Sequence, residues 1–128
     1  MRRKSVCGVA CQGQKYLVAQ RKPGGSQGGK WEFPGGKLED GEEPAAALQR
    51  EFQEELSVAI EVLAYLGCTT FQNGENQYLL EAWRINLHSE EFSLNEHQKV
   101  FWADLSTLLT MDLSDSDRDI VKLLSKNL

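Results

Sequence analysis

The stretch GKLEDGEEPAAALQREFQEELSV, residues 36–58, decides the fold of this 128-residue chain. Its second half predicts a helix from Pro44 to about Leu56, because proline is tolerated in a first helical turn and acidic residues favour a helix N-terminus. Apolar residues at three- and four-residue steps form one stripe along this helix, which has to pack against a core. The stripe consists of Ala45, Leu48, Phe52 and Leu56.

Segments typical of β-strands flank the helix on both sides. The first two are separated by the turn Gln12–Gly13–Gln14 and are expected to form a hairpin, after which the glycine-rich segment Lys22–Lys30 is expected to be a loop. The expected strands are Ser5–Cys11, Lys15–Gln20, Val62–Phe71, Gln77–Leu87 and Lys99–Leu105.

A second helix is expected from about Asp117 to Lys126, with its apolar residues facing inward: Ile120, Val121, Leu123 and Leu124. Strands before and after a helix, joined by short turns, indicate an α/β (α+β) fold in which a mixed β-sheet is sandwiched between helices. The length predicts a single domain over residues 1–128.

The charge of the chain is unevenly distributed. Its 19 acidic and 14 basic residues give a net charge of -5, so the surface as a whole does not attract a nucleic-acid backbone or an anionic membrane. Seven of the 19 acids lie between Glu39 and Glu55, where Arg50 is the only base. Acid at this density suggests a bound cation.

The three cysteines and the N-terminal segment indicate the cellular setting. Cys7, Cys11 and Cys68 are an odd number without metal-ligand spacing, and we expect free, mostly buried thiols in a reducing cytoplasm. The basic start Met1–Lys4 is followed by a segment too short and mixed for a secretory signal. No run of residues approaches the roughly 18 apolar residues of a membrane span.

Three carboxylates share one side of the predicted helix. At about 100° per residue, Glu55 lies about 40° and Glu54 about 60° from Glu51, and Arg50 is placed to pair with Glu54. Like charges at these spacings repel, and a hard divalent cation such as Mg²⁺ or Mn²⁺ would turn the repulsion into coordination. The alternative is an acidic helix face that is only solvated.

The spacing around this helix resembles the Nudix box. In that box the order is glycine, glutamate, Arg-Glu, an apolar residue, Glu-Glu, glycine and an apolar residue, and every position of residues 36–58 matches except Ser57, where the family has glycine. A residue that follows a helix often adopts a left-handed conformation, which penalises a Cβ atom. We expect Ser57 to affect stability more than activity. The flanking segment Trp31–Lys37 resembles the MutT branch of the family.

The resemblance implies a site and a reaction. It makes Glu51, Glu54, Glu55 and the backbone carbonyl of Gly35 ligands of Mg²⁺, or of Mn²⁺, and it makes Arg50 the residue that holds the glutamates by charge-assisted hydrogen bonds. Glu96 falls where MutT-like enzymes carry a further glutamate, a metal ligand or general base. MutT-like enzymes cut a nucleoside triphosphate to the monophosphate and pyrophosphate.

The residues that would contact the nucleotide are open to two interpretations each. Arg21 and Lys37 are candidate phosphate contacts or ordinary surface cations. Phe33 is a candidate to pack on the base or a core aromatic. Asp117 aligns with a residue that reads the base edge in MutT-like enzymes, but an aspartate that caps a helix fits its position equally well, and Asp115 and Asp119 compete for either role.

An ionised Asp117 would offer only hydrogen-bond acceptors, which suits guanine or cytosine. Oxidised nucleotides such as 8-oxo-dGTP rank first as substrates. CTP or modified dCTP is the alternative, because His97–Gln98 and Ala82–Trp83 resemble the cytidine branch. Other Nudix substrates and a binding module without turnover rank lower. The expected partner is a small nucleotide, with no nucleic-acid polymer and no membrane, and the expected state is a monomer.

Overall fold

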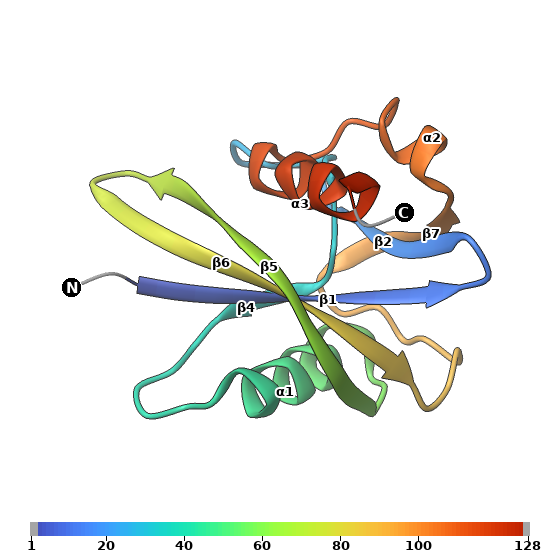
Figure 1. Cartoon of the computed structure of the whole chain (residues 1–128), viewed down its shortest axis with the longest axis horizontal. Coiled ribbons are helices and arrows are strands. Elements are labelled where there is room, and N and C mark those ends of the chain that lie inside the picture. The colour runs from blue at the N-terminus through green and yellow to red at the C-terminus, as the bar shows by residue number, and fades with distance from the viewer. Residues whose placement is uncertain (1–2, 127–128) are drawn as a thin grey trace.

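A mixed β-sheet forms the centre of the computed structural model, and helices cover both of its sides (Figure 1). The structure describes residues 3–126, so Met1, Arg2 and the last two residues of the expected 1–128 domain lie outside it. The elements in chain order are β1 Arg3–Gln12, β2 Lys15–Arg21, β3 Trp31–Glu32, β4 Gly35–Lys37, α1 Pro44–Leu56, β5 Ile60–Asn73, β6 Asn76–Leu87, β7 His97–Ala103, α2 Leu105–Leu108 and α3 Asp115–Lys126.

Strand β1 is the central strand of the sheet. It pairs in parallel with β6 from Arg3↔Tyr78 to Ala10↔Ile85, and β6 pairs with β5 in antiparallel fashion. At its far end β1 turns into β2 through the predicted hairpin, and β2 then pairs with both β3 and β7. Residues 5–10 of β1 are all buried, as expected of a strand covered on both faces. The mixed sheet predicted from the sequence is therefore confirmed.

Helix α1 covers one face of the sheet with the bounds predicted from the sequence. Leu48, Phe52 and Leu56 are buried as expected, but Ala45 is exposed and the prediction for it was wrong. Ala45 lies in the first turn, and the buried part of the helix begins only at Ala47. The ring of Phe52 rests directly on the backbone of β1, where a Cβ atom on Gly8 would lie 2.5 Å from Phe52 Cε1.

Helix α3 covers the other face and buries Ile120, Val121 and Leu124, while Leu123 is only partly buried. The expected strand Lys99–Leu105 begins two residues earlier and ends at Ala103. The strand ends there because the side chain of Asp104 accepts a hydrogen bond from the Thr107 amide at 2.8 Å and caps the short helix α2. This short helix was not predicted from the sequence.

The cysteines follow the prediction only in part. Within residues 3–126 none forms a disulfide, but Cys7 alone is buried, Cys11 is half-buried and Cys68 is exposed on β5. The prediction of mostly buried thiols was therefore wrong for Cys68, which lies on the edge strand of the sheet. Among the described residues, no helix is long and apolar enough to cross a membrane.

The contact between Gly8 and Phe52 yields a stability prediction. Gly8→Ala should lower the free energy of unfolding by about 1–3 kcal/mol, because the added methyl group overlaps the Phe52 ring. Urea unfolding measures the loss. In the double variant with Phe52→Leu, which provides room, the loss should be smaller than the sum of the two single losses. Additive losses, or a Gly8→Ala protein as stable as the parent, would contradict this packing.

Candidate active site

Two consecutive glycines bring strand β4 against helix α1. A Cβ atom on Gly36 would lie 2.5 Å from Glu51 Oε1, so only glycine leaves space for this carboxylate. A Cβ atom on Gly35 would collide with the carbonyl of Val6 on β1. The Gly-Gly pair therefore lets the backbone of β4 lie between β1 and the carboxylates of α1.

Arg50 ties three parts of this site together. Its Nε and Nη2 donate to the two carboxylate oxygens of Glu42, each at 2.9 Å, and its Nη1 donates to Glu51 Oε1 at 2.8 Å. Nη2 also donates to the carbonyl of Lys37 at 3.0 Å, and Nη1 lies 3.4 Å from Glu54 Oε2, the pairing predicted from the spacing. These hydrogen bonds lower the pKa of Glu42 to about 2 and fix the loop before α1.

The three helix carboxylates lie in very different surroundings. The side chain of Glu54 is 55% exposed, that of Glu51 14% and that of Glu55 only 2%. Burial, a hydrogen bond with Glu51 and the charges of Glu32 and Glu96 raise the pKa of Glu55 to about 10. A buried carboxyl among three other acids favours either a proton or a cation.

His97 and Glu32 complete the group around Glu55. His97 Nε2 lies 3.0 Å from Glu32 Oε2 and 3.8 Å from Glu55 Oε1, and Arg21 Nη1 donates to Glu32 Oε1 at 3.1 Å. Glu32 was not predicted from the sequence as a site residue, and His97 was noted only for a family likeness. Their proximity depends on β2, which pairs at Ala19 with Glu32 on one side and at Arg21 with His97 on the other.

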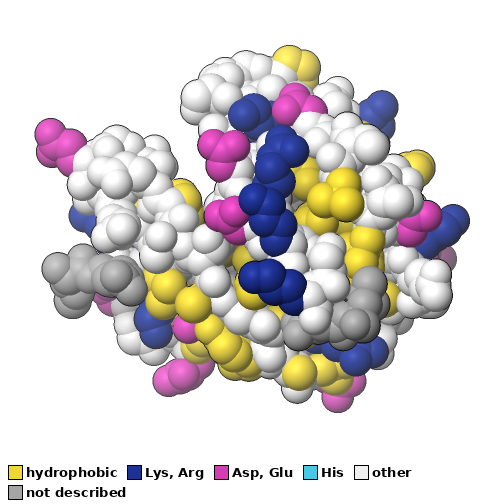
Figure 2. Space-filling view, turned by 45° about the horizontal axis from the view of Figure 1, so that its top comes forward, with side chains coloured by type: hydrophobic (Ala, Val, Ile, Leu, Met, Phe, Trp, Pro, Cys, Tyr) yellow, Lys and Arg dark blue, Asp and Glu magenta, His cyan; other side chains and the backbone are white. Residues whose placement is uncertain are grey.

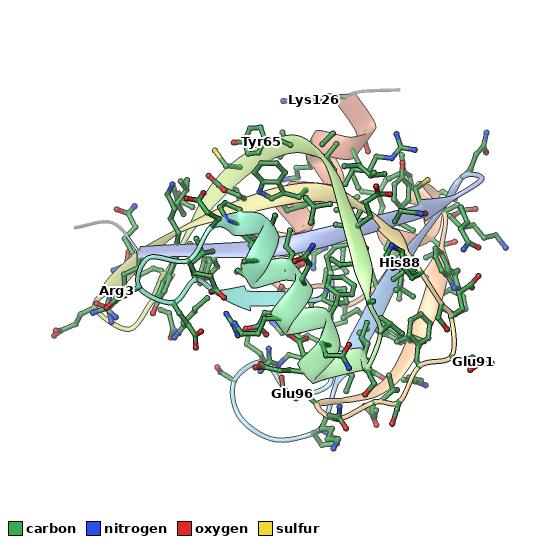
Figure 3. The ribbon with its side chains drawn as sticks, turned by 90° about the horizontal axis from the view of Figure 1, so that it is seen from below. Arg3, Tyr65, His88, Glu91, Glu96 and Lys126 are labelled. Carbon is green, nitrogen blue, oxygen red and sulfur yellow. The ribbon has the colours of Figure 1, made fainter. Side chains whose placement is uncertain are left out.

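Glu96 lies close to this group. It is exposed, and its charge contributes to the raised pKa of Glu55. Figure 3 shows it beside the C-terminal part of α1. Ser93 and Asn95, just before it, donate backbone hydrogen bonds to the carbonyls of Leu56 and Glu55. The structure therefore places Glu96 near the C-terminal end of α1, close enough for its charge to act on Glu55.

The two candidate phosphate contacts lie in different places. Arg21 is exposed at the end of β2 and is paired with Glu32. Lys37 lines a groove of about 680 Å³ together with Arg3, Lys4 and Tyr78, and its Nζ lies 5.0 Å from the centre of the Tyr78 ring. Glu42, the partner of Arg50, lines the same groove. Lys37 is thus adjacent to the carboxylate site, which is the group of acids around Glu51, Glu54 and Glu55 of α1.

The two candidate base contacts are buried. Phe33 is 3% exposed and lies in the core cluster under α3, which favours the alternative of a core aromatic. Asp117 is 6% exposed; its Oδ1 accepts the Phe33 amide at 2.9 Å and its Oδ2 contacts Ser114 Oγ at the start of α3. Burial raises the pKa of Asp117 to about 7. Asp115 is exposed, and Asp119 accepts a hydrogen bond from Thr69.

Basic side chains gather on the α3 side of the molecule. Figure 2 shows lysine and arginine side chains along the middle of this face, next to a hollow. Helix α3 itself carries Arg118, Lys122 and Lys126 at four-residue steps. Positive charge is therefore concentrated on this side although the net charge is -5.

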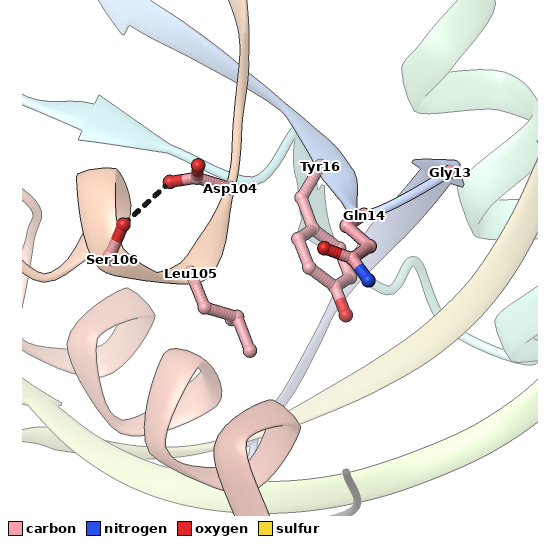
Figure 4. Close-up of a pocket in the computed structure, with 6 residues that line it drawn as sticks. All are labelled: Gly13, Gln14, Tyr16, Asp104, Leu105 and Ser106. Carbon is pink, nitrogen blue, oxygen red and sulfur yellow. Dashed lines mark hydrogen bonds between the residues drawn. The ribbon is translucent and has the colours of Figure 1, made fainter.

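A second cavity, of about 320 Å³, contains no predicted site residue. It lies between the β1–β2 turn and α2 (Figure 4) and is lined by Gly13, Gln14, Tyr16, Asp104, Leu105 and Ser106. Its side chains include one carboxylate, Asp104, whose oxygen already accepts from Ser106 and Thr107. The chemistry of the carboxylate site has no counterpart in this cavity.

The carboxylate site fits a divalent cation. Oxygen atoms of Glu32 and Glu55 and a ring nitrogen of His97 lie within 4.8 Å of one another and could hold a metal ion. Carboxylate oxygens are the ligands that Mg²⁺ and Mn²⁺ prefer, and a cation would offset the mutual repulsion of the acids around Glu55.

Comparison with known proteins identifies the family. A model of the NUDIX domain matches residues 1–124. A Mycobacterium tuberculosis H37Rv protein named "Putative 8-oxo-dGTP diphosphatase 2" is 34% identical over 126 residues, which cover 96% of this chain and 88% of that protein. The CTP pyrophosphohydrolase of Escherichia coli K12 is 33% identical over 103 residues, 80% of this chain and 76% of that protein.

The fold agrees with this assignment. The solution structure of the E. coli ORF135 protein superposes with a TM-score of 0.88 at 29% identity and covers 98% of this chain and 91% of that one. The chain belongs to the Nudix family, with a MutT-like sequence, as its motif predicted. It is a hydrolase that acts on phosphorus-containing anhydrides.

The raised pKa of Glu55 yields a pH prediction. The pKa of this carboxyl rises from about 4.5 in the unfolded chain to about 10 in the fold, so its contribution to stability is complete below pH 4.5 and is lost as the pH rises toward 10. Glu55→Gln imitates the protonated carboxyl and cannot ionise. Without metal it should unfold at a higher temperature than the parent at about pH 8.5, and the difference should shrink toward about pH 5.

Thermal unfolding at both pH values, with and without Mg²⁺, measures this effect. Mg²⁺ should stabilise the parent more than Glu55→Gln at the higher pH, because binding requires the ionised carboxylate. A difference in unfolding temperature that does not change with pH would show that Glu55 does not titrate as described.

Proposed function

We propose that this Nudix hydrolase is a metal-dependent nucleoside triphosphate pyrophosphohydrolase, which converts a nucleoside triphosphate and water to the monophosphate and pyrophosphate. The observation that carries the proposal is the carboxylate cluster of α1, with Glu55 buried among further acids and Arg50 joined to Glu42 and Glu51. Such a cluster suits the binding of an anionic polyphosphate through divalent cations.

The residues are assigned the following roles. Glu51, Glu54 and Glu55, with the Gly35 carbonyl and Glu96, would hold Mg²⁺ or Mn²⁺, and the bound ion would neutralise the polyphosphate and assist the attacking water. Arg50 holds the carboxylates in position, since its planar guanidinium contacts Glu42 in two places. Glu96 is exposed at the edge of the cluster, where a general base can reach a water molecule.

Arg21 and Lys37 are proposed phosphate contacts. Lys37 is the better placed of the two, because it lines the groove that also contains Glu42, whereas Arg21 would have to exchange Glu32 for the substrate. Both are exposed cations and can reorient toward a ligand.

For the base, 8-oxo-dGTP ranks first and CTP or a modified dCTP second. Relatives at similar identity carry names for both activities, so identity alone does not choose between them. Asp117 remains the proposed base contact, and its carboxylate also accepts the amide of Phe33, whose buried ring favours the core role over a contact with the base. A base that bonds to Asp117 would have to compete with the hydroxyl of Ser114. We further propose that the protein works as a monomer in the cytoplasm on free nucleotides.

Glu54 provides a test of the metal site that spares the fold. Its side chain is 55% exposed, so Glu54→Gln should leave the unfolding temperature close to that of the parent. Turnover should fall by about 100-fold or more, since removing a residue that merely supports a metal ligand already costs about 10- to 100-fold. Pyrophosphate release with Mg²⁺ measures the effect, and unchanged turnover would refute the role of Glu54.

The choice of base is tested by comparing kcat/KM for 8-oxo-dGTP, dGTP, CTP, dCTP and 5-methyl-dCTP under one set of conditions. We expect the highest value for 8-oxo-dGTP. A preference for an unmodified pyrimidine would reverse the ranking and favour CTP pyrophosphohydrolase activity. Absence of pyrophosphate release from any nucleotide would overturn the proposed reaction and favour another Nudix substrate or a binding module without turnover.

A further inference from the structure

Helix α1 ends at a residue in an unfavourable conformation. Ser57 has φ 60° and ψ 37°, and among residues 3–126 it is the only non-glycine residue with positive φ. The Nudix box has glycine here, which adopts this conformation without the steric cost of a Cβ atom. A serine that carries this cost is expected to make contacts that glycine cannot make.

The hydroxyl of Ser57 makes two such contacts with the segment that precedes Glu96. Ser57 Oγ donates a hydrogen bond to the carbonyl of Ser93 and accepts one from Asn95 Nδ2, each at 3.2 Å. Asn95 Nδ2 also donates to the carbonyl of Glu54 at 2.7 Å. Because a carbonyl only accepts, this last bond fixes the orientation of the Asn95 amide.

The backbone of the same segment satisfies the last carbonyls of α1. The amides of Ser93 and Asn95 donate to the carbonyls of Leu56 and Glu55 at 3.1 and 3.0 Å. The end of a helix leaves such carbonyls without partners inside the helix. Three consecutive carbonyls of α1, at residues 54–56, are therefore bound by residues 93–95.

We propose, in place of the expectation that Ser57 affects stability more than activity, that Ser57 and Asn95 are positioning residues for Glu96, an inference that rests on the proposed function. Residues 91–96 lie in no helix or strand, and these hydrogen bonds hold the segment on α1 together with the packing of Phe92 and Leu94 against the core cluster. Two of the bound carbonyls belong to Glu54 and Glu55 themselves, so the hydrogen bonds fix the position of the segment relative to the proposed metal ligands. The Ser57–Asn95 pair therefore sets the distance from Glu96 to the carboxylates of α1.

A matched pair of variants separates positioning from stability. Ser57→Ala removes the hydroxyl and keeps the strained conformation, whereas Ser57→Gly removes both, so Ser57→Gly should unfold at the higher temperature of the two. Both should lower kcat by the same factor, about tenfold, with KM nearly unchanged. Full kcat in Ser57→Gly would show that the hydroxyl positions nothing.

Asn95→Ala should also lower kcat about tenfold, and Asn73→Ala, at the exposed C-terminal end of β5, is the control expected to leave it unchanged. If Asn95 acts through Glu96, Asn95→Ala in a Glu96→Gln background should cause little further loss. Losses that multiply in the double variant would overturn the inference.

Amide hydrogen exchange gives a readout that does not depend on turnover. The amides of Ser93 and Asn95 should exchange about tenfold faster in Ser57→Ala and Asn95→Ala than in the parent, in protein without metal or nucleotide. Unchanged exchange would overturn the inference even if the parent is active. A parent without pyrophosphate release but with faster exchange in the variants would instead refute the proposed function and leave the attachment of the segment intact.

Discussion

The carboxylate of Glu55 is buried beside His97 of β7 and Glu32 of β3, and the rest of the site is arranged around this group. A charged carboxylate in such surroundings requires a partner. The chain places His97 on one side of it and the Arg50–Glu51 pair on the other. These groups come from two elements, α1 and β7, so both elements must hold their positions for the buried carboxyl to be tolerated. The packing of Phe52 onto Gly8, one turn before Glu55, fixes α1 on the sheet.

The same constraint explains how an acidic protein can act on an anionic molecule. The acids between Glu39 and Glu55 are not simply a solvated surface, because Arg50 pairs with four of them and Glu55 lies in the interior. Their mutual repulsion favours the binding of a cation, because a bound cation would relieve it. Lys37 lies next to this cluster, in the groove that also contains Glu42, whereas the basic residues of α3 lie on the other face of the sheet.

Local patterns predicted a large part of this arrangement. The α1 bounds, the β1–β2 hairpin and the mixed sheet follow from turn residues and hydrophobic periodicity, which act over a few residues. The errors also have local causes. Ala45 belongs to the apolar stripe but precedes the buried part of the helix, and Asp104 starts a short helix inside a segment with strand character. Cys68 lies on an edge strand, which a sequence does not distinguish from a central one.

The sequence by itself determined the family, the helix that carries Glu51, Glu54 and Glu55, and the role of Arg50 as their neighbour, because all of these depend on fixed spacing along one helix. Only the tertiary structure decided that Glu32 and His97 join Glu55, that Phe33 and Asp117 are buried, and that Ser57 binds the segment before Glu96. Those residues are separated by tens of positions, and their proximity depends on strand pairing through β2 and on the unpaired carbonyls at the end of α1. Pairing between distant segments results from the packing of the whole chain and leaves no periodic pattern in the sequence.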